Sequence, residues 1–296
     1  RQMSQKVIAF LGPEGTYSSR ARIMYDPKAK GLPCLSNIAV IEAVQTGKAD
    51  EGVVAIENAL EGSVNDTTDF LIHNGEGVFI CGEVIVPIRH FLFTRPVLGW
   101  ELIKIVFSHP QALGQCGNFL RKHLPHAQQV ASLSTVQAIE DMLESKTPAA
   151  AIAPYEAIEA YRGRAVVYGG LSIQDYDNNA TRFAVIGREA RKPTGNDKTS
   201  ICFSFAVTDK PALLLRTLGV FARRGINLTK VESRPEKTEL GRYVFLLDFE
   251  GHQEDKPVLS ALRGLGRLRE TDETGKSIPL LSMLRVFGSY PRQNGS

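Results

Sequence analysis

Thr181 and Arg182 stand side by side in the segment Asn178 to Phe183, where a neutral hydroxyl donor meets a fixed cation. A hydroxyl of this kind can hydrogen-bond an oxygen that leaves a substrate, and a guanidinium can hold an anion. The same pair also occurs by chance at the start of many strands. The segment therefore becomes a candidate site only together with other polar segments of the chain.

The glycine-rich segment Gly12 to Ser18 lies between an expected strand and an expected helix. Backbone N–H groups and the positive end of a helix meet at such a turn, so Thr16 and Ser18 could help to bind an anion. The segment lacks the Gly-Lys-Ser/Thr ending of a nucleotide-binding P-loop. A capped strand-to-helix turn without a ligand is the alternative interpretation.

Polar residues also occupy the segment Ala55 to Asn65, where a strand is expected to give way to a helix. Ligands of open α/β sheets bind beyond the carboxyl ends of strands, which favours a binding role for Asn58 and Ser63. The alternative is that these two residues cap the helix and that Glu57 and Glu61 are surface carboxylates.

A third strand end is followed by Ser108, and the helix that begins there carries Gln111 and Gln115 one turn apart on the same face. His109 could be taken for a general base, but the following proline holds it extended and no nearby acid orients it. A structural or hydrogen-bonding role for His109 is therefore favoured.

Composition excludes several classes of protein. The 296 residues suggest about two domains of roughly 150 residues each, and 43% hydrophobic with 23% charged residues is typical of a globular chain. A net charge of +3 is too small for a nucleic-acid interface. No apolar run is long enough to cross a membrane, and no signal peptide is evident.

The cysteines give no support to zinc binding or to a disulfide framework, because they are scattered and no pair has Cys-x-x-Cys spacing. They are expected to be reduced thiols in a cytoplasmic protein. A Gly-x-Ser-x-Gly motif and a Cys-His pair are both missing, so covalent hydrolysis is not indicated. The four residues are Cys34, Cys81, Cys116 and Cys202.

Strands alternate with helices up to about residue 188, which predicts an α/β fold with a largely parallel sheet. Pro87 interrupts the extended run Glu83 to Phe93, so this run is expected at a sheet edge or in a crossing segment. The other expected strands are Val7–Leu11, Glu51–Ile56, Ile103–Phe107, Ala149–Ala153 and Arg182–Ile186, and the expected helices include Ile38–Thr46, Gln111–His123 and Val136–Glu144.

A polar linker at 189–198 separates this region from a different pattern. The order strand, helix, strand, strand, helix, strand follows, which is the split ferredoxin-like βαββαβ unit. Its first strand, Thr199–Val207, alternates apolar and polar residues and is expected to have one solvent-exposed face.

Taken in order, the motifs resemble prephenate dehydratase followed by an ACT regulatory domain. The resemblance extends from about Val7 to Tyr290. It is carried by seven segments: Gly12–Ser18, Ile56–Asn58, Glu61–Val64, Ser108–Ala112, Ser134–Thr135, Asn179–Phe183 and, in the ACT part, Gly225–Pro235.

The resemblance implies a two-lobed, periplasmic-binding-protein-like catalytic domain at 6–188, with its active site between the lobes, and an ACT domain at 199–290. It implies that prephenate loses water and carbon dioxide to give phenylpyruvate in phenylalanine biosynthesis, with no metal or organic cofactor. It also implies phenylalanine as an effector bound at a subunit interface, hence a homodimer or homotetramer. Nucleic-acid and membrane partners are not expected.

Roles for individual residues follow from the same resemblance. Thr181 is the catalytic candidate, together with Arg182, which either holds substrate or organises the site. The substrate-binding candidates are Thr16, Ser18, Asn58, Ser63, Ser108, Gln115, Asn179 and Phe183. The effector-binding candidates are Ala212, Leu213, Asn227, Leu228, Glu232, Ser233, Arg234 and Pro235.

This sequence departs from the family pattern at several positions. Ala212 replaces a glycine of the ACT loop, which disfavours a positive φ or crowds the effector, so phenylalanine control is in question. Ala59, Val136 and Ala180 also differ from the family motifs and could shift the preference from prephenate to its amino analogue, arogenate. A non-catalytic sensor of small anions or amino acids is the second hypothesis.

Overall fold

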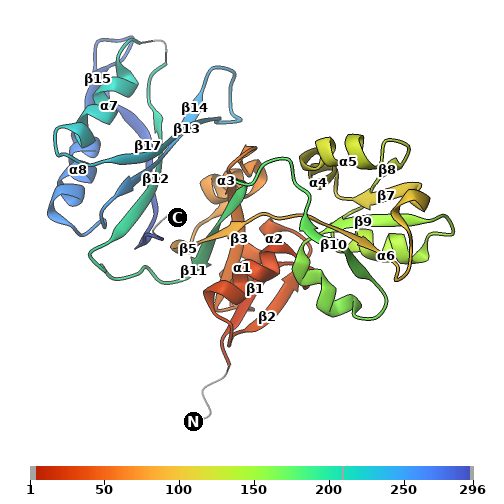
Figure 1. Ribbon diagram of the computed structural model, residues 1–296. Coiled ribbons are helices and arrows are strands. Elements are labelled where there is room, and N and C mark those ends of the chain that lie inside the picture. Colours follow the sequence, from red (N-terminus) through yellow and green to blue (C-terminus); the bar gives the residue numbers. More distant parts are fainter. Residues whose placement is uncertain (1–4, 209, 294–296) are drawn as a thin grey trace. The chain divides into compact units, whose positions relative to one another are not determined.

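The structure is a computed structural model that describes residues 5–208 and 210–293. It divides into two compact units (Figure 1). The first contains the chain as far as Thr68 and then Val84–Phe183, and the second contains Asp69–Glu83 and the chain from Ala184 onward. None of the described helices is long and apolar enough to cross a membrane.

The first sheet has the strand order β2-β1-β3-β11-β5, with β4 paired to β3. Strand β1 pairs in parallel with both β2 and β3. Apolar runs form these strands because helices cover the sheet; β1 is buried over its three central residues. The bounds are β1 Val7–Leu11, α1 Tyr17–Tyr25, β2 Lys30–Cys34, α2 Asn37–Gln45, β3 Glu51–Asn58, β4 Gly62–Ser63, α3 Asn65–Asn74, β5 Phe79–Pro87 and β11 Ala180–Gly187.

The second sheet has the order β10-β6-β9-β7-β8 and forms the other lobe. Strand β7 is parallel to β8 and β9, whereas β6 is antiparallel to β9 and β10. The bounds are β6 Phe91–Thr94, β7 Ile105–Ser108, α4 Pro110–Gln115, α5 Gly117–His123, β8 Gln128–Ala131, α6 Gln137–Glu144, β9 Ala149–Ala153 and β10 Val166–Ser172, with 3-10 helices at Trp100–Leu102 and Tyr155–Tyr161.

Two segments of chain connect the lobes, one between β5 and β6 and one between β10 and β11. The expectation that Pro87 lies at a sheet edge or in a crossing segment is confirmed. Pro87 ends β5, which is the last strand of its sheet, and the chain then crosses to β6.

The single helix predicted over Gln111–His123 is wrong. Cys116 leaves helical geometry at φ −114° and ψ 16°, and the chain forms α4 and α5 instead. The break leaves Gln115 at the last position of α4.

The C-terminal sheet has the antiparallel order β13-β14-β12-β17, and Figure 1 shows α7 and α8 together on one face. The predicted βαββαβ order is confirmed, with a small extra hairpin, β15–β16, before the last strand. The bounds are β12 Asp197–Phe205, α7 Leu213–Ala222, β13 Leu228–Pro235, β14 Tyr243–Glu250, α8 Lys256–Arg267, β15 Arg269–Thr271, β16 Ser277–Pro279 and β17 Leu281–Pro291.

The solvent-exposed face expected for the first strand of this domain is wrong, because β12 is buried on both faces. The segment Asp69–Glu83 of the same compact unit contacts the strands. Arg285 of β17 donates to the carbonyl oxygens of Leu71 and Gly75, and Lys198 forms an ion pair with the almost fully buried Glu83 at 3.0 Å. A piece of chain from before the linker thus completes the C-terminal unit.

Candidate functional site

Thr181 lies at the second position of β11, where its hydroxyl oxygen accepts a hydrogen bond from Asn58 Nδ2 at 3.0 Å. Asn58 ends the neighbouring strand β3 and is buried, whereas Thr181 is half-buried. Adjacent strand ends therefore place the two side chains together. Within residues 5–208 and 210–293 the Thr181 hydroxyl has no acceptor for its own proton, so it can donate that proton to a ligand.

The amide groups around Thr181 form a chain of hydrogen bonds that joins the two lobes. Asn58 Nδ2 donates to Asn179 Oδ1 at 2.9 Å, and Asn179 Nδ2 donates to Gln115 Oε1 at 2.9 Å. Gln115 Nε2 then donates to Glu61 Oε1 at 2.9 Å. Asn58 and Glu61 belong to the first lobe, whereas Gln115 ends α4 of the second lobe.

His90 is tied to the same chain from the crossing segment between β5 and β6. Its Nε2 lies 2.9 Å from Gln115 Oε1, and because that oxygen can only accept, Nε2 carries a proton. Burial lowers the pKa of His90, and the hydrogen bond to Gln115 opposes this effect only in part. His90 is therefore a neutral donor that supports Gln115.

Tyr17 contacts the other side of this histidine. The two rings meet edge to face, with centroids 5.9 Å apart. Burial, with smaller contributions from Glu156 and Cys116, raises the pKa of the Tyr17 phenol. The phenol therefore keeps its proton, which it donates to the backbone carbonyl of Arg89. Neither Tyr17 nor His90 was predicted from the sequence as part of the site.

The guanidinium of Arg182, the other catalytic candidate, forms an ion pair with the carboxylate of Glu57. Its Nε and one terminal nitrogen lie 3.0 Å and 2.9 Å from Glu57 Oε2, and its side chain is only 12% exposed. Arg182 and Glu57 lie on β11 and β3, next to Thr181 and Asn58 respectively. The pair therefore locks these two strands at the point where the hydroxyl and the amide meet.

Of the five remaining substrate-binding candidates, two form hydrogen bonds within the fold and three are buried or half-buried. Thr16 accepts from the backbone N–H of Ser19 and thereby caps α1, and Ser108 is fully buried and donates to the Ile152 carbonyl at 2.7 Å. Phe183 is also buried at 2% exposure. Ser18 is buried on α1, and Ser63 is half-buried on β4 opposite Glu57.

His109 has the hydrogen-bonding role that the sequence favoured. Its Nδ1 accepts from the backbone N–H of Gln111 at 3.3 Å and caps α4. The structure also corrects the interpretation of Glu61 as a plain surface carboxylate, because both Gln111 and Gln115 donate to it. The pairing of two glutamines one turn apart was visible in the sequence, but their common acceptor lies 50 residues from Gln111 along the chain.

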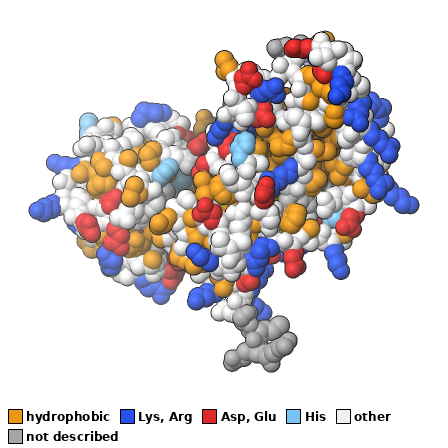
Figure 2. Space-filling view, turned by 180° about the vertical axis from the view of Figure 1, so that it is seen from behind, with side chains coloured by type: hydrophobic (Ala, Val, Ile, Leu, Met, Phe, Trp, Pro, Cys, Tyr) orange, Lys and Arg blue, Asp and Glu red, His pale blue; other side chains and the backbone are white. Residues whose placement is uncertain are grey.

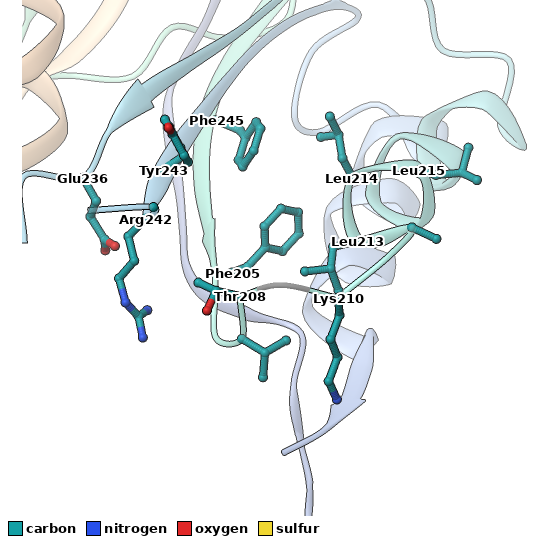
Figure 3. Close-up of a pocket in the computed structure, with 13 residues that line it drawn as sticks. Phe205, Thr208, Lys210, Leu213, Leu214, Leu215, Glu236, Arg242, Tyr243 and Phe245 are labelled. Carbon is teal, nitrogen blue, oxygen red and sulfur yellow. The ribbon is translucent and has the colours of Figure 1, made fainter. Parts of the chain in front are cut away.

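The C-terminal unit contains a separate pocket of about 430 Å³, at the end of the sheet where α7 begins. Figure 3 shows Phe205, Phe245 and Leu214 turned toward one another, with Lys210, Arg242 and Glu236 around the opening. Ala212 and Leu213 belong to the lining. Ala212 has φ 64° and ψ 11°, so the alanine keeps the left-handed conformation that its residue type disfavours.

The other effector candidates are distributed along β13. Asn227 and Leu228 stand at its far end, about 23 Å from Pro235 at the rise of an extended strand. Asn227 donates to Glu250 there, and Leu228 packs on the core.

Glu232 pairs with Lys230 at 3.0 Å, and Arg234 makes a two-pronged ion pair with Asp69 at 3.0 to 3.1 Å. Ser233 and Pro235 are exposed. Among the residues that the structure describes, one chain therefore brings only Ala212 and Leu213 of the effector set into the pocket.

Comparisons with known proteins match both the two-lobed region and the C-terminal domain. A family model for prephenate dehydratase matches residues 8–191, and a model for the ACT domain matches residues 203–267. The chain belongs to the prephenate dehydratase family. The expected fold, a two-lobed α/β region followed by an ACT domain, is confirmed.

Three relatives illustrate this membership. The chain is 39% identical over 287 residues to the bifunctional chorismate mutase/prephenate dehydratase of Aquifex aeolicus, covering 96% of this chain and 73% of that protein. It is 39% identical over 258 residues to the prephenate dehydratase of Methanocaldococcus jannaschii, covering 84% and 90% respectively. The crystal structure of the Arthrobacter aurescens enzyme in complex with L-Phe superposes with a TM-score of 0.82 at 34% identity, covering 97% of this chain and 90% of that one.

Proposed function

We propose that this prephenate dehydratase converts prephenate into phenylpyruvate, water and carbon dioxide, with the hydroxyl of Thr181 donating a hydrogen bond to the departing oxygen. The observation that carries this role is the direction of the Asn58–Thr181 hydrogen bond. Because Asn58 supplies the donor, the Thr181 proton is left for a ligand. Family membership supplies the reaction, and this contact supplies the role.

The chemistry needs little more than this. The electron pair of the bond between the ring and its carboxylate enters the ring as carbon dioxide leaves, and the ring C–O bond breaks on the opposite side. The departing hydroxide takes up a proton and becomes water, so one proton from solvent is consumed per turnover of the dianion. Aromatisation drives the reaction, and a donor at the leaving oxygen stabilises charge that develops only in the transition state.

A cation held tightly on the ring carboxylate would oppose its loss, because the carboxylate charge moves into the ring in the transition state. The arrangement of Arg182 is consistent with this requirement, since Glu57 already neutralises it. We therefore propose that Arg182 organises the strand pair rather than binding the ring carboxylate. The neutral amide of Asn58 then contacts Thr181, and it is held in turn by Asn179 and Gln115.

We further propose that L-phenylalanine binds at the Ala212 pocket and that the second half of the site comes from another copy of this chain. The A. aurescens relative binds L-Phe. Strand β13 is an edge strand, and Val231 on it and Tyr243 on the neighbouring β14 are about half exposed. Figure 2 also shows hydrophobic side chains gathered on the C-terminal part of the molecule. A dimer, or a tetramer built from dimers, would unite the two ends of β13.

The proposed boundaries are 6–188 for the catalytic domain, 189–198 for the linker and 199–290 for the ACT domain. The proposed location is the cytoplasm. All four cysteines are free thiols and three of them are buried, which suits a reducing compartment.

Incubation of the purified protein with prephenate tests the function directly. Phenylpyruvate should accumulate and be measured by its ultraviolet absorbance in base. Arogenate in a parallel reaction should reveal phenylalanine if Ala59, Val136 and Ala180 favour the amino analogue. Tight binding of prephenate without any product would instead support the sensor hypothesis.

A further inference from the structure

The amide chain next to Thr181 closes into a ring, and Glu61 occupies both ends of it. The backbone N–H of Glu61 donates to Asn58 Oδ1 at 3.2 Å, beside that of Leu60 at 3.0 Å. The ring then continues through Asn58, Asn179 and Gln115 and returns to the carboxylate of Glu61. Every hydrogen bond in the ring runs in the same direction.

Two groups of Glu61 fix that direction. A carboxylate can only accept, so the Gln115 amide must present its nitrogen to Glu61 and its oxygen to Asn179. A backbone N–H can only donate, so Asn58 must present its oxygen to the turn and its nitrogen to Asn179 and Thr181. His90 Nε2, at 2.9 Å from Gln115 Oε1, enforces the same orientation of Gln115.

We infer that the Glu61 carboxylate is a positioning group for the dehydration. It fixes the Gln115 end of the ring, while the backbone N–H groups of Leu60 and Glu61 fix the Asn58 end, and together they make Asn58 donate to Thr181. The Thr181 hydroxyl is thereby prevented from donating to Asn58 and keeps its proton for the leaving oxygen. This inference rests on the role proposed for Thr181. It explains why an exposed glutamate at the β3–β4 turn contacts two glutamines of the other lobe.

Gln111 provides a matched control. It donates to Glu61 Oε2 at 2.7 Å, but it has no contact with Asn179 or His90 among the described residues. Both glutamines could tether the lobes through Glu61, but only Gln115 is a member of the ring. The substitution Gln111→Met removes the first contact and leaves the ring intact.

The test compares kcat and KM for prephenate in four variants whose folding is checked by circular dichroism. Glu61→Gln allows the 61 side chain to donate, so we expect kcat to fall about 10- to 100-fold while KM changes less than about 3-fold. Gln115→Glu sets two carboxylates against each other and should cause a similar loss. In the exchange variant Glu61→Gln/Gln115→Glu, position 115 is again an acceptor for Asn179 and His90, so kcat should return to within about 5-fold of the wild type.

Three results would overturn the inference. One is a Glu61→Gln enzyme whose kcat stays within about 2-fold of the wild type. Another is an exchange variant whose kcat is reduced by the product of the two single-variant losses. The third is a Gln111→Met enzyme as impaired as Glu61→Gln, which would make Glu61 a tether only. A wild type that does not turn over prephenate would instead refute the proposed function and this inference with it.

Discussion

The site around Thr181 and the pocket at Ala212 belong to different compact units and differ in the side chains that form them. Around Thr181, the neutral amides of Asn58, Asn179 and Gln115 hold one another in fixed orientations. Around Ala212, apolar side chains line an open pocket and the backbone is held in a disfavoured conformation. The first site is assembled within one chain, whereas the candidate residues of the second are spread over the start of α7 and the length of β13.

This contrast shows how each site depends on the rest of the molecule. A preorganised donor is worth most when its orientation is set before the substrate arrives, which a ring of amides achieves without a second subunit. An effector site that one chain leaves incomplete can respond to the arrangement of subunits. Substitutions in the two sites should therefore fail in different ways.

Asn58→Asp should produce the largest effect. The carboxylate has the same shape but cannot donate, so the Thr181 hydroxyl would turn its proton toward the new carboxylate and away from the substrate. We expect kcat for prephenate to fall about 10²- to 10⁴-fold, the range for loss of a group that assists proton transfer. Steady-state kinetics measures this, and a kcat close to that of the wild type would show that the direction of the bond does not matter.

Phenylalanine binding should distinguish the pocket from the Thr181 site. Calorimetry at millimolar L-phenylalanine should detect binding, and Leu214→Ala should weaken it about 10-fold by removing apolar contact from the ring of the effector. Leu171→Ala is the control, because Leu171 on β10 is exposed, belongs to the other compact unit and does not line the pocket. Absence of any binding heat in the wild type would contradict an effector role for the pocket.

Asp69→Asn should destabilise the C-terminal unit without a direct effect on Thr181. Burial alone would raise the pKa of Asp69, but hydrogen bonds and charge from Lys237 and Arg234 outweigh it and leave this pKa lowered. The carboxyl is 12% exposed, so we expect a loss of about 2 kcal/mol at pH 7, between the values for surface and buried pairs.

The sign of the pH dependence follows from the lowered pKa. Stability from Asp69 is complete above the ordinary carboxyl pKa of about 4 and disappears as the pH falls through the lower folded value. Urea unfolding should therefore show a difference between wild type and Asp69→Asn that shrinks in acid. Glu239→Gln, which breaks the exposed ion pair with Arg242, is the control and should cost no more than about 0.5 kcal/mol.

Ala212→Gly should have the smallest effect, and it should stabilise the fold where Asp69→Asn destabilises it. Glycine relieves the left-handed strain at φ 64° but loses more entropy on folding, so we expect a net stabilisation of about 0.5 to 1 kcal/mol. Ala222→Gly, in the last turn of α7 where the backbone is right-handed, should destabilise by a similar amount. Thermal unfolding compares the two, and equal destabilisation by both would refute the strain.

Much of the fold was predictable because its signals are local. Apolar runs located β1, β3, β7 and β9, and the βαββαβ order of the C-terminal domain followed from periodicity and turns. Asn58 was a candidate because polar residues at strand ends carry a general expectation of binding. Thr181 and Asn179 became candidates through the resemblance to the family. The role of each residue remains a proposal.

The rest depended on contacts between distant segments. The second face of β12 is covered with the help of Asp69–Glu83, whose Glu83 lies 115 residues before Lys198 in the chain. The break at Cys116 interrupts a pattern that is helical on both sides. Glu61 was indistinguishable from a surface carboxylate until its bonds to two glutamines were seen, and His90 showed no motif at all.

The role of the Thr181 hydroxyl is tested most directly by kcat for prephenate in Thr181→Ser and Thr181→Val. Serine keeps the hydroxyl and valine keeps the shape of the side chain. We expect the valine enzyme to lose about 10²- to 10⁴-fold and the serine enzyme to stay within about 10-fold of the wild type. A folded Thr181→Val enzyme with kcat within about 3-fold of the wild type would contradict the role of this hydroxyl.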